Sequence, residues 1–206
     1  MVARTRARPA AREDTPDSRS ILEAAKRLLA DEGPSALTMR RLAQASRTST
    51  MVLYTRFGSR DAVIEALLAD GFSRFADMLG AVAEADPTEH LRELGRAYRR
   101  FALANPTSYR LMWMGLQPAD CERHLNESKA APHGARAFSA LIVAVTRLLA
   151  AKDRPAKDAE PLAMAVWSTV HGFVSLELNG AAPPGVDVES LYERALEFAV
   201  AGVVAR

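Results

Sequence analysis

Residues 38–60 read TMRRLAQASRTSTMVLYTRFGSR, and this stretch organises the N-terminal part of the chain. Its apolar positions recur three and four residues apart, which predicts a short helix from about Thr38. Residues 46–48 favour a turn, and Ser49 is a suitable N-cap for a second helix. Taken alone, residues 49–55 are also compatible with a strand, because β-branched and aromatic side chains favour extended backbone.

Helical patterns flank this stretch on both sides. Before it, a helix with its apolar face around Ile21 ends at Gly33-Pro34. Asp17, Ser18 and Ser20 are its possible caps, and Ser20 with Glu23 also fits a capping box. After it, a long helix is predicted from Ser59 to about residue 85. Two short helices joined by a three- or four-residue turn, behind a longer helix, describe a helix-turn-helix unit.

In such a unit the second helix enters the major groove of DNA and its first turn reaches the base edges. Thr50 and Met51 lie where hydroxyl and methyl groups meet bases, and a phenol such as Tyr54 reaches phosphate. Arg40 suits a bidentate contact with guanine. The candidate DNA contacts are Thr38, Arg40, Ser49, Thr50, Met51, Tyr54, Thr55 and Arg60. The alternative is that the unit serves packing only, since many three-helix units bind no DNA.

The charge distribution supports a nucleic-acid contact at the N-terminal end. Residues 1–60 carry a net charge of +6 and residues 61–206 carry −4. A basic segment joined to an acidic body is typical of such an arrangement. We therefore divide the chain into a basic flexible arm (1–16), a helix-turn-helix domain (17–60) and a ligand-binding and dimerisation domain (61–206).

Composition excludes several classes of protein. The 206 residues are 49% hydrophobic and 25% charged, which is ordinary for a soluble globular chain, and Cys121 alone builds no disulfide framework. We find neither a membrane span nor a signal peptide, and we predict a cytoplasmic location. The four histidines show no metal-ligand spacing and no nucleophile with its base is identifiable. We predict no enzyme activity, no metal and no cofactor.

Helical spacing continues to the C-terminus, so we predict an all-α fold of about nine helices, with residues 117–134 as a loop. The helices at about 158–179 and 187–205 are apolar on most sides. A helix of that kind is buried on most sides, which favours a homodimer through these two helices. The alternative is that they form the centre of a monomeric bundle.

The residues that carry the helix-turn-helix pattern, with ILEAA at 21–25, Gly33 and the run 49–60, resemble the DNA-binding domain of TetR-family transcriptional regulators. The resemblance implies that Tyr54 contacts phosphate and that Arg60 stands where a phosphate-binding Lys is usual. It also places Arg47 where the family usually has Gly. If that position requires positive φ, Arg costs about 1 kcal/mol there.

The C-terminal half resembles the region named for its Trp-His-Gly signature, through residues 98–106, 109–112, Trp167 and His171-Gly172. In the family this half binds a small molecule and forms the dimer. We predict an apolar pocket bounded by Phe101, Tyr109, Met112, Trp113, Trp167 and His171. Each of these residues, taken singly, is also a common core residue.

Together these patterns predict a ligand-responsive transcriptional regulator. The predicted form is a repressor that binds a near-palindromic double-stranded DNA operator as a homodimer and is released by a small, largely apolar effector. The alternative is an all-α small-molecule-binding protein or enzyme without specific DNA binding. An activator is equally compatible with the sequence.

Overall fold

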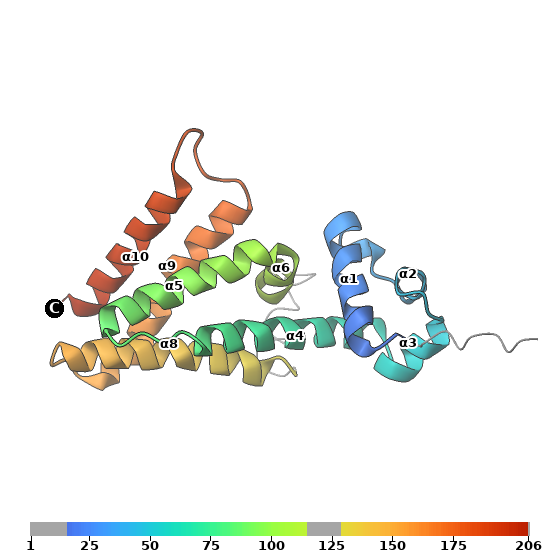
Figure 1. Ribbon diagram of the computed structural model, residues 1–206, viewed down its shortest axis with the longest axis horizontal. Helices are drawn as coiled ribbons and strands as arrows, with labels where there is room; N and C mark the ends of the chain where they lie inside the picture. Colours follow the sequence, from blue (N-terminus) through green and yellow to red (C-terminus); the bar gives the residue numbers. More distant parts are fainter. Residues whose placement is uncertain (1–15, 115–128, 206) are drawn as a thin grey trace, which may run out of the picture. The chain divides into compact units, whose positions relative to one another are not determined.

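The computed structural model describes residues 16–114 and 129–205, and within them it contains nine α-helices, two short 3-10 helices and no strand (Figure 1). The prediction of an all-α fold of about nine helices is confirmed. The described residues form two compact units, 16–60 and 61–205. Residues 1–15 of the predicted arm and residues 117–128 of the predicted loop lie outside the described part of the chain.

The first unit is a three-helix arrangement whose helices start at side-chain caps. Its elements are α1 (Ser18–Glu32), η1 (Pro34–Ala36), α2 (Met39–Ala45) and α3 (Thr50–Phe57). Asp17 caps α1 by accepting a hydrogen bond of 2.7 Å from the Ser20 backbone N–H. The predicted capping box headed by Ser20 is therefore wrong, because Ser20 lies inside the first turn that Asp17 caps.

Burial explains why residues 49–55 are a helix and not a strand. Leu53 is fully buried, while its neighbours Met51 and Tyr54 are exposed, which matches the period of a helix with one inward face. Ser49 accepts a hydrogen bond of 3.2 Å from the Val52 backbone N–H and so caps the helix. The cap and the tertiary core together override the strand preference of these side chains.

The turn between α2 and α3 is a Schellman motif with arginine at its left-handed position. Arg47 has φ 51, and its N–H donates to the Gln44 carbonyl at 3.2 Å. The Thr48 N–H donates to the Ala43 carbonyl at 2.9 Å, which completes the pair of hydrogen bonds that defines the motif. The turn therefore forms even though Arg47 adopts the left-handed backbone conformation, which is unfavourable for a residue with a Cβ atom.

The second unit holds the remaining helices. They are α4 (Arg60–Gly80, from Asp61 on in this unit), α5 (Pro87–Ala104), α6 (Pro106–Met114), α8 (Ala131–Ala151), η2 (Ala156–Asp158), α9 (Ala159–Leu178) and α10 (Val188–Val204). The long helix predicted from Ser59 to about residue 85 starts within one residue of that prediction, at Arg60, but ends earlier, at Gly80. Residues 131–134, predicted as loop, form the first turn of α8. Pro132 is tolerated there because the backbone N–H groups of a first helical turn have no acceptor within the helix.

Helices α5, α8, α9 and α10 pack against one another and form the core of this unit (Figure 1). Val145, Leu148 and Leu149 of α8 are fully buried in it. Between α5 and α10 the approach is so close that a Cβ atom at Gly95 would overlap the Leu196 side chain. Tyr192 is buried beside this contact, and its hydroxyl donates to the Gly95 carbonyl at 2.5 Å.

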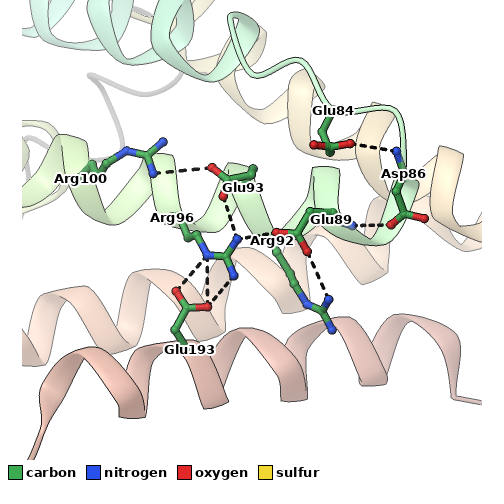
Figure 2. Close-up of polar contacts among 8 residues, drawn as sticks. All are labelled: Glu84, Asp86, Glu89, Arg92, Glu93, Arg96, Arg100 and Glu193. Carbon is green, nitrogen blue, oxygen red and sulfur yellow. Dashed lines mark hydrogen bonds and ion pairs between the residues drawn. The ribbon is translucent and has the colours of Figure 1, made fainter.

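An arginine on α5 ties α10 to the bundle. Figure 2 shows the Arg96 guanidinium among three carboxylates, with distances of 2.7 Å to Glu193, 2.5 Å to Glu89 and 2.7 Å to Glu93. These hydrogen bonds raise the pKa of Arg96 and lower the pKa of Glu193 and of Glu89. A second pair, Arg99 with Glu177 at 2.7 Å, joins α5 to α9.

Helix α8 is long and apolar enough to cross a membrane by length and composition, the one such helix in the described residues. It packs against α5 and α9 in the bundle, and a core helix of a soluble protein passes the same test. Two arginines interrupt the apolar run. Arg136 forms an ion pair with Asp77, and Arg147 donates to the backbone carbonyls of residues 84 and 85. Its inward face, with Ala144, Val145 and Leu148, is buried in the core, which accounts for part of its hydropathy.

Candidate nucleic-acid interface and ligand cavity

The outer face of α3 presents a set of exposed side chains on a fixed helix. Met51 is 75% exposed and Tyr54 is 53% exposed, and Thr50 and Thr55 on the same face are also exposed. Leu53 anchors the opposite face in the core. A short helix held by one buried leucine and one cap can therefore offer its first turn to a partner without losing its own packing.

The other predicted contacts at helix starts serve first as caps. Thr38 accepts a hydrogen bond of 3.2 Å from the Arg41 N–H, as Ser49 does at the start of α3. Arg40 is exposed on the first turn of α2. The structure thus places Thr38, Arg40 and Ser49 at solvent-facing helix N-termini, where backbone N–H groups favour anions such as phosphate.

Several arginines of this unit are committed to local contacts. Arg60 donates through Nε to the Leu37 carbonyl at 2.6 Å and through a terminal nitrogen to the Pro34 carbonyl at 3.3 Å, so it holds the turn before α2. Arg41 donates to the Glu32 carboxylate at 2.5 Å. The predicted phosphate contact of Arg60 stays a prediction, and the structure adds a positioning role that the sequence did not suggest.

A cavity of about 250 Å³ lies within the second unit. It is open to solvent on one side and is lined by residues of α4, α5, α6, α8 and α9 together with the residue that precedes α8. The lining residues are Phe72, Phe75, Leu79, Tyr98, Trp113, Ala130, Ala131, Gly134, Ala135, Ala137, Phe138, Leu141, Met164 and Trp167. The set is almost wholly apolar and holds both tryptophans of the chain. Concave apolar sites of this kind are where proteins bind small organic molecules.

Two of the six residues predicted for the pocket, Trp113 and Trp167, line this cavity, with ring centroids 5.1 Å apart. The other four stand behind its wall. Phe101 packs on the Phe75 ring at 5.0 Å, and Met112 contacts Gly71 on α4. Tyr109 and His171 belong to a polar cluster next to Trp113.

That cluster brings two phenols and an imidazole together inside an apolar core. The Tyr98 and Tyr109 hydroxyls lie 2.8 Å and 2.9 Å from His171 Nδ1, and 3.1 Å from each other. Burial lowers the pKa of His171 and raises the pKa of both tyrosines, so the cluster is neutral at pH 7. A neutral imidazole has one accepting and one protonated nitrogen; because two hydroxyls lie close to Nδ1, we assign Nδ1 as the acceptor and the proton to Nε2, which lies 3.5 Å from Ser175 Oγ.

Sequence reasoning missed most of the lining residues. The pattern identifies Phe72, Phe75 and Leu79 only as the apolar face of a long helix, and it assigns Gly134 to a loop. Helical period shows which side chains turn inward, but a wall residue and a core residue share the same period. Whether an inward-facing side chain lines a cavity or packs in the core depends on how the five helices are arranged in the tertiary fold.

The described residues contain no group of three or more His, Cys, Asp or Glu side chains that could hold a metal ion. The site therefore consists of a solvent-facing helix in one unit and an apolar cavity in the other. A helix-turn-helix unit joined to a helical domain with such a cavity defines a class, the ligand-responsive DNA-binding regulators.

Comparison with known proteins places the chain within that class. The family model described as "Bacterial regulatory proteins, tetR family" matches residues 21–67, and the model described as "Tetracyclin repressor-like, C-terminal domain" matches residues 91–199. The chain belongs to the TetR family of transcriptional regulators and binds DNA through its helix-turn-helix unit. Its assignment to the Trp-His-Gly type stays a prediction.

Relatives and solved structures agree with this assignment. The HTH-type transcriptional regulator Rv1816 of Mycobacterium tuberculosis is 25% identical over 189 residues, which cover 78% of this chain and 80% of the relative. The TetR-family regulator PfmR from Thermus thermophilus has a TM-score of 0.65 at 21% identity, covering 90% of this chain and 99% of PfmR. FadR of Bacillus subtilis, solved with stearoyl-CoA, has a TM-score of 0.74 at 15% identity; the match covers 90% of this chain and 99% of FadR.

At these identities the structural likenesses show the shared fold. The family and the curated relatives are transcriptional regulators, which confirms the prediction that the chain is not an enzyme.

Proposed function

We propose that this regulator is a cytoplasmic repressor that binds a near-palindromic operator as a homodimer and leaves it when a small, largely apolar effector binds. The observation that carries the proposal is the contrast along α3, where Leu53 is fully buried and Met51 and Tyr54 are largely exposed. A helix built in this way presents base-contacting and phosphate-contacting groups from a rigid support.

Exposed apolar side chains on the last two helices support the homodimer. Phe198 on α10 is 72% exposed and Leu176 on α9 is 62% exposed. An apolar groove between α9 and α10, lined by Leu162, Ala165 and Phe198 among others, lies on the same helices. An isologous contact between two copies would bury these groups and set two α3 helices about 34 Å apart on successive major grooves.

The cavity supports control by a small molecule. Solved relatives of the same fold hold such molecules: stearoyl-CoA in FadR of Bacillus subtilis, and minocycline in a TetR variant of Acinetobacter baumannii. Release requires that the effector binds the DNA-free state more tightly than the DNA-bound state. Linkage then demands that effector weakens operator binding by the same factor by which operator weakens effector binding.

Selection of random duplex DNA on the purified protein tests the proposal. We expect an enriched near-palindrome, with affinity that falls steeply as salt rises because phosphate contacts release counterions. Enrichment of a single half-site bound by monomer would overturn the homodimer. Absence of any motif would overturn a sequence-specific operator.

Two variants separate backbone contacts from base contacts. Tyr54→Ala is expected to weaken all duplexes about equally. Arg40→Ala is expected to lose about 1–3 kcal/mol on duplexes that carry the contacted guanine and little on duplexes in which that guanine is replaced. Arg100→Ala is the control, because it removes another exposed arginine, on α5 in the other unit. Equal losses for Arg40→Ala and Arg100→Ala would contradict the base contact of Arg40.

A further inference from the structure

The size of the cavity limits what it can hold. Its volume is about 250 Å³, and a protein cavity of roughly 150 Å³ is known to accept benzene. Two fused six-membered rings therefore fill this space, while a single ring leaves much of it empty.

The wall of the cavity is shaped for flat rings. Phe72 meets Trp113 edge to face, with centroids 5.2 Å apart and an angle of 80° between the planes. Trp167 is inclined to both Trp113 and Phe138, with centroids at 5.1 Å and 6.0 Å. Ring edges and faces thus alternate around the space, and this is the arrangement in which an added aromatic ring gains beyond its buried area.

The lining also excludes charge. Among the described residues that line the cavity none is Lys, Arg, His, Asp or Glu, and the polar side chains are Tyr98, Trp113 and Trp167. The Tyr98 hydroxyl is already bonded to His171 and Tyr109. A charge placed among these side chains would lose its hydration, and no charged side chain of the described lining would pair with it.

A second, smaller space lies on the same side chains, next to α9. It measures about 30 Å³ and shares Leu79, Tyr98, Leu141 and Trp167 with the main space. The rest of its lining is apolar and includes Gly95, the residue at which α5 and α10 approach most closely. A space of this size accepts one small apolar substituent such as a methyl group.

We propose that the effector is an uncharged molecule of about two fused aromatic rings that carries at most a small apolar substituent. This inference rests on the proposed role of the cavity as the effector site. It narrows that role from apolar ligands in general to one class of aromatic ligands.

Three probes of matched shape test the proposal by calorimetry at pH 7 on the full chain. They are naphthalene, 1-methylnaphthalene and 1-naphthoate, the last being anionic. We expect both hydrocarbons to bind with a negative heat-capacity change and 1-naphthoate to bind at least 100-fold more weakly. Equal affinity for 1-naphthoate and 1-methylnaphthalene, or binding of naphthoate alone, would overturn the proposal.

Two variants test whether the probes bind in the cavity. A Cβ atom at Gly134 would lie 3.7 Å from the Phe72 ring, an ordinary contact, so α8 tolerates a side chain there. Gly134→Leu is expected to fill the cavity and weaken 1-methylnaphthalene at least tenfold. Ala150→Leu adds the same side chain to the exposed end of α8 and is expected to leave affinity unchanged. Equal affinities in the two variants, each with an unchanged helical spectrum, would overturn the site.

A third variant is designed to let the cavity bind the anionic probe. Met164 is 47% exposed at the rim of the cavity, so a lysine there keeps its ammonium in water while its stem packs inward. Met164→Lys is expected to bind 1-naphthoate at least tenfold more tightly than the parent protein. No gain in this folded variant would contradict the charge argument.

The operator assay separates this inference from the proposed function. If 1-methylnaphthalene binds but leaves operator affinity unchanged, the ligand class stands and the release of the repressor by this site fails. If operator is released only by an anionic or long-chain molecule, the repressor stands and the ligand class fails.

Discussion

The two units of the chain are specified by interactions of different range. In residues 16–60 each helix starts at a side-chain cap three residues from its partner: Asp17, Thr38 and Ser49. In residues 61–205 the polar contacts that fix the bundle join distant residues, with 97 positions between Arg96 and Glu193 and 73 between Tyr98 and His171. Sequence patterns therefore predict most of the local structure of the first unit, but for the second unit they predict the helices and not the contacts between them.

The largest expected effect tests whether the units are also separate in stability. Leu53→Ala removes a fully buried side chain from the first unit and is expected to cost about 2–5 kcal/mol of unfolding free energy. Leu148→Ala is its counterpart in the bundle core. In calorimetry each variant is expected to lower one transition and leave the other. A single transition that both variants lower equally would show that the units unfold together.

Residues 38–60 illustrate what local signals can predict. The caps, the turn at 46–48 and the exposed start of α3 follow from residue type and spacing within a few positions. The one local error, the capping box at Ser20, arose because Asp17 competes for the same backbone N–H and wins. Whether the predicted residues contact DNA stays a prediction.

The cavity illustrates what local signals cannot predict. Trp113 and Trp167 were predicted from their aromatic character, and both line it. Tyr109 and His171 have the same character but turn toward each other and Tyr98, because a buried imidazole and phenols must satisfy their hydrogen bonds. Their position depends on how α5, α6 and α9 meet, which no short window of sequence contains.

A second variant acts on a contact that only the tertiary fold creates. Arg96→Ala is expected to cost about 1–2 kcal/mol at pH 7, since three partly exposed ion pairs are lost and solvent screens each of them. The measurement is denaturant unfolding of the full chain. The matched control is Arg100→Ala, which removes one long and more exposed pair from the same helix and is expected to change stability by a few tenths of a kcal/mol.

The same variant has a predictable dependence on pH. Hydrogen bonds from Arg96 hold the pKa of Glu193 and of Glu89 below the ordinary value of 4.5. The folded state then binds fewer protons than the unfolded state, so this stabilisation is present above pH 4.5 and is lost as the pH falls through the lowered pKa values. The difference between parent and Arg96→Ala should shrink in acid. A difference that stays constant down to about pH 3 would contradict the ion pairs as its cause.

A third variant uses the cap of α3 to separate stability from recognition. Ser49→Ala removes the acceptor for the Val52 N–H and is expected to cost about 1 kcal/mol. Ser49→Asp and Ser49→Asn both restore a capping oxygen, but only aspartate adds a negative charge where phosphate is expected. We expect both to match the parent in denaturant unfolding, and only Ser49→Asp to lose operator affinity. Equal operator affinity would remove Ser49 from the DNA interface.

The smallest effect concerns the turn that joins the two helices of the DNA-binding motif. Arg47 lies at φ 51, where a Cβ atom is disfavoured by about 1 kcal/mol and glycine is not. Arg47→Gly is therefore expected to stabilise the first unit by about 0.5 kcal/mol, because the greater freedom of glycine in the unfolded chain offsets part of the gain. Arg47→Ala, which removes the same charge and keeps the Cβ, is expected to leave stability unchanged. If operator affinity falls equally in both variants while only glycine stabilises, the left-handed arginine is kept for its charge toward DNA and not for the turn.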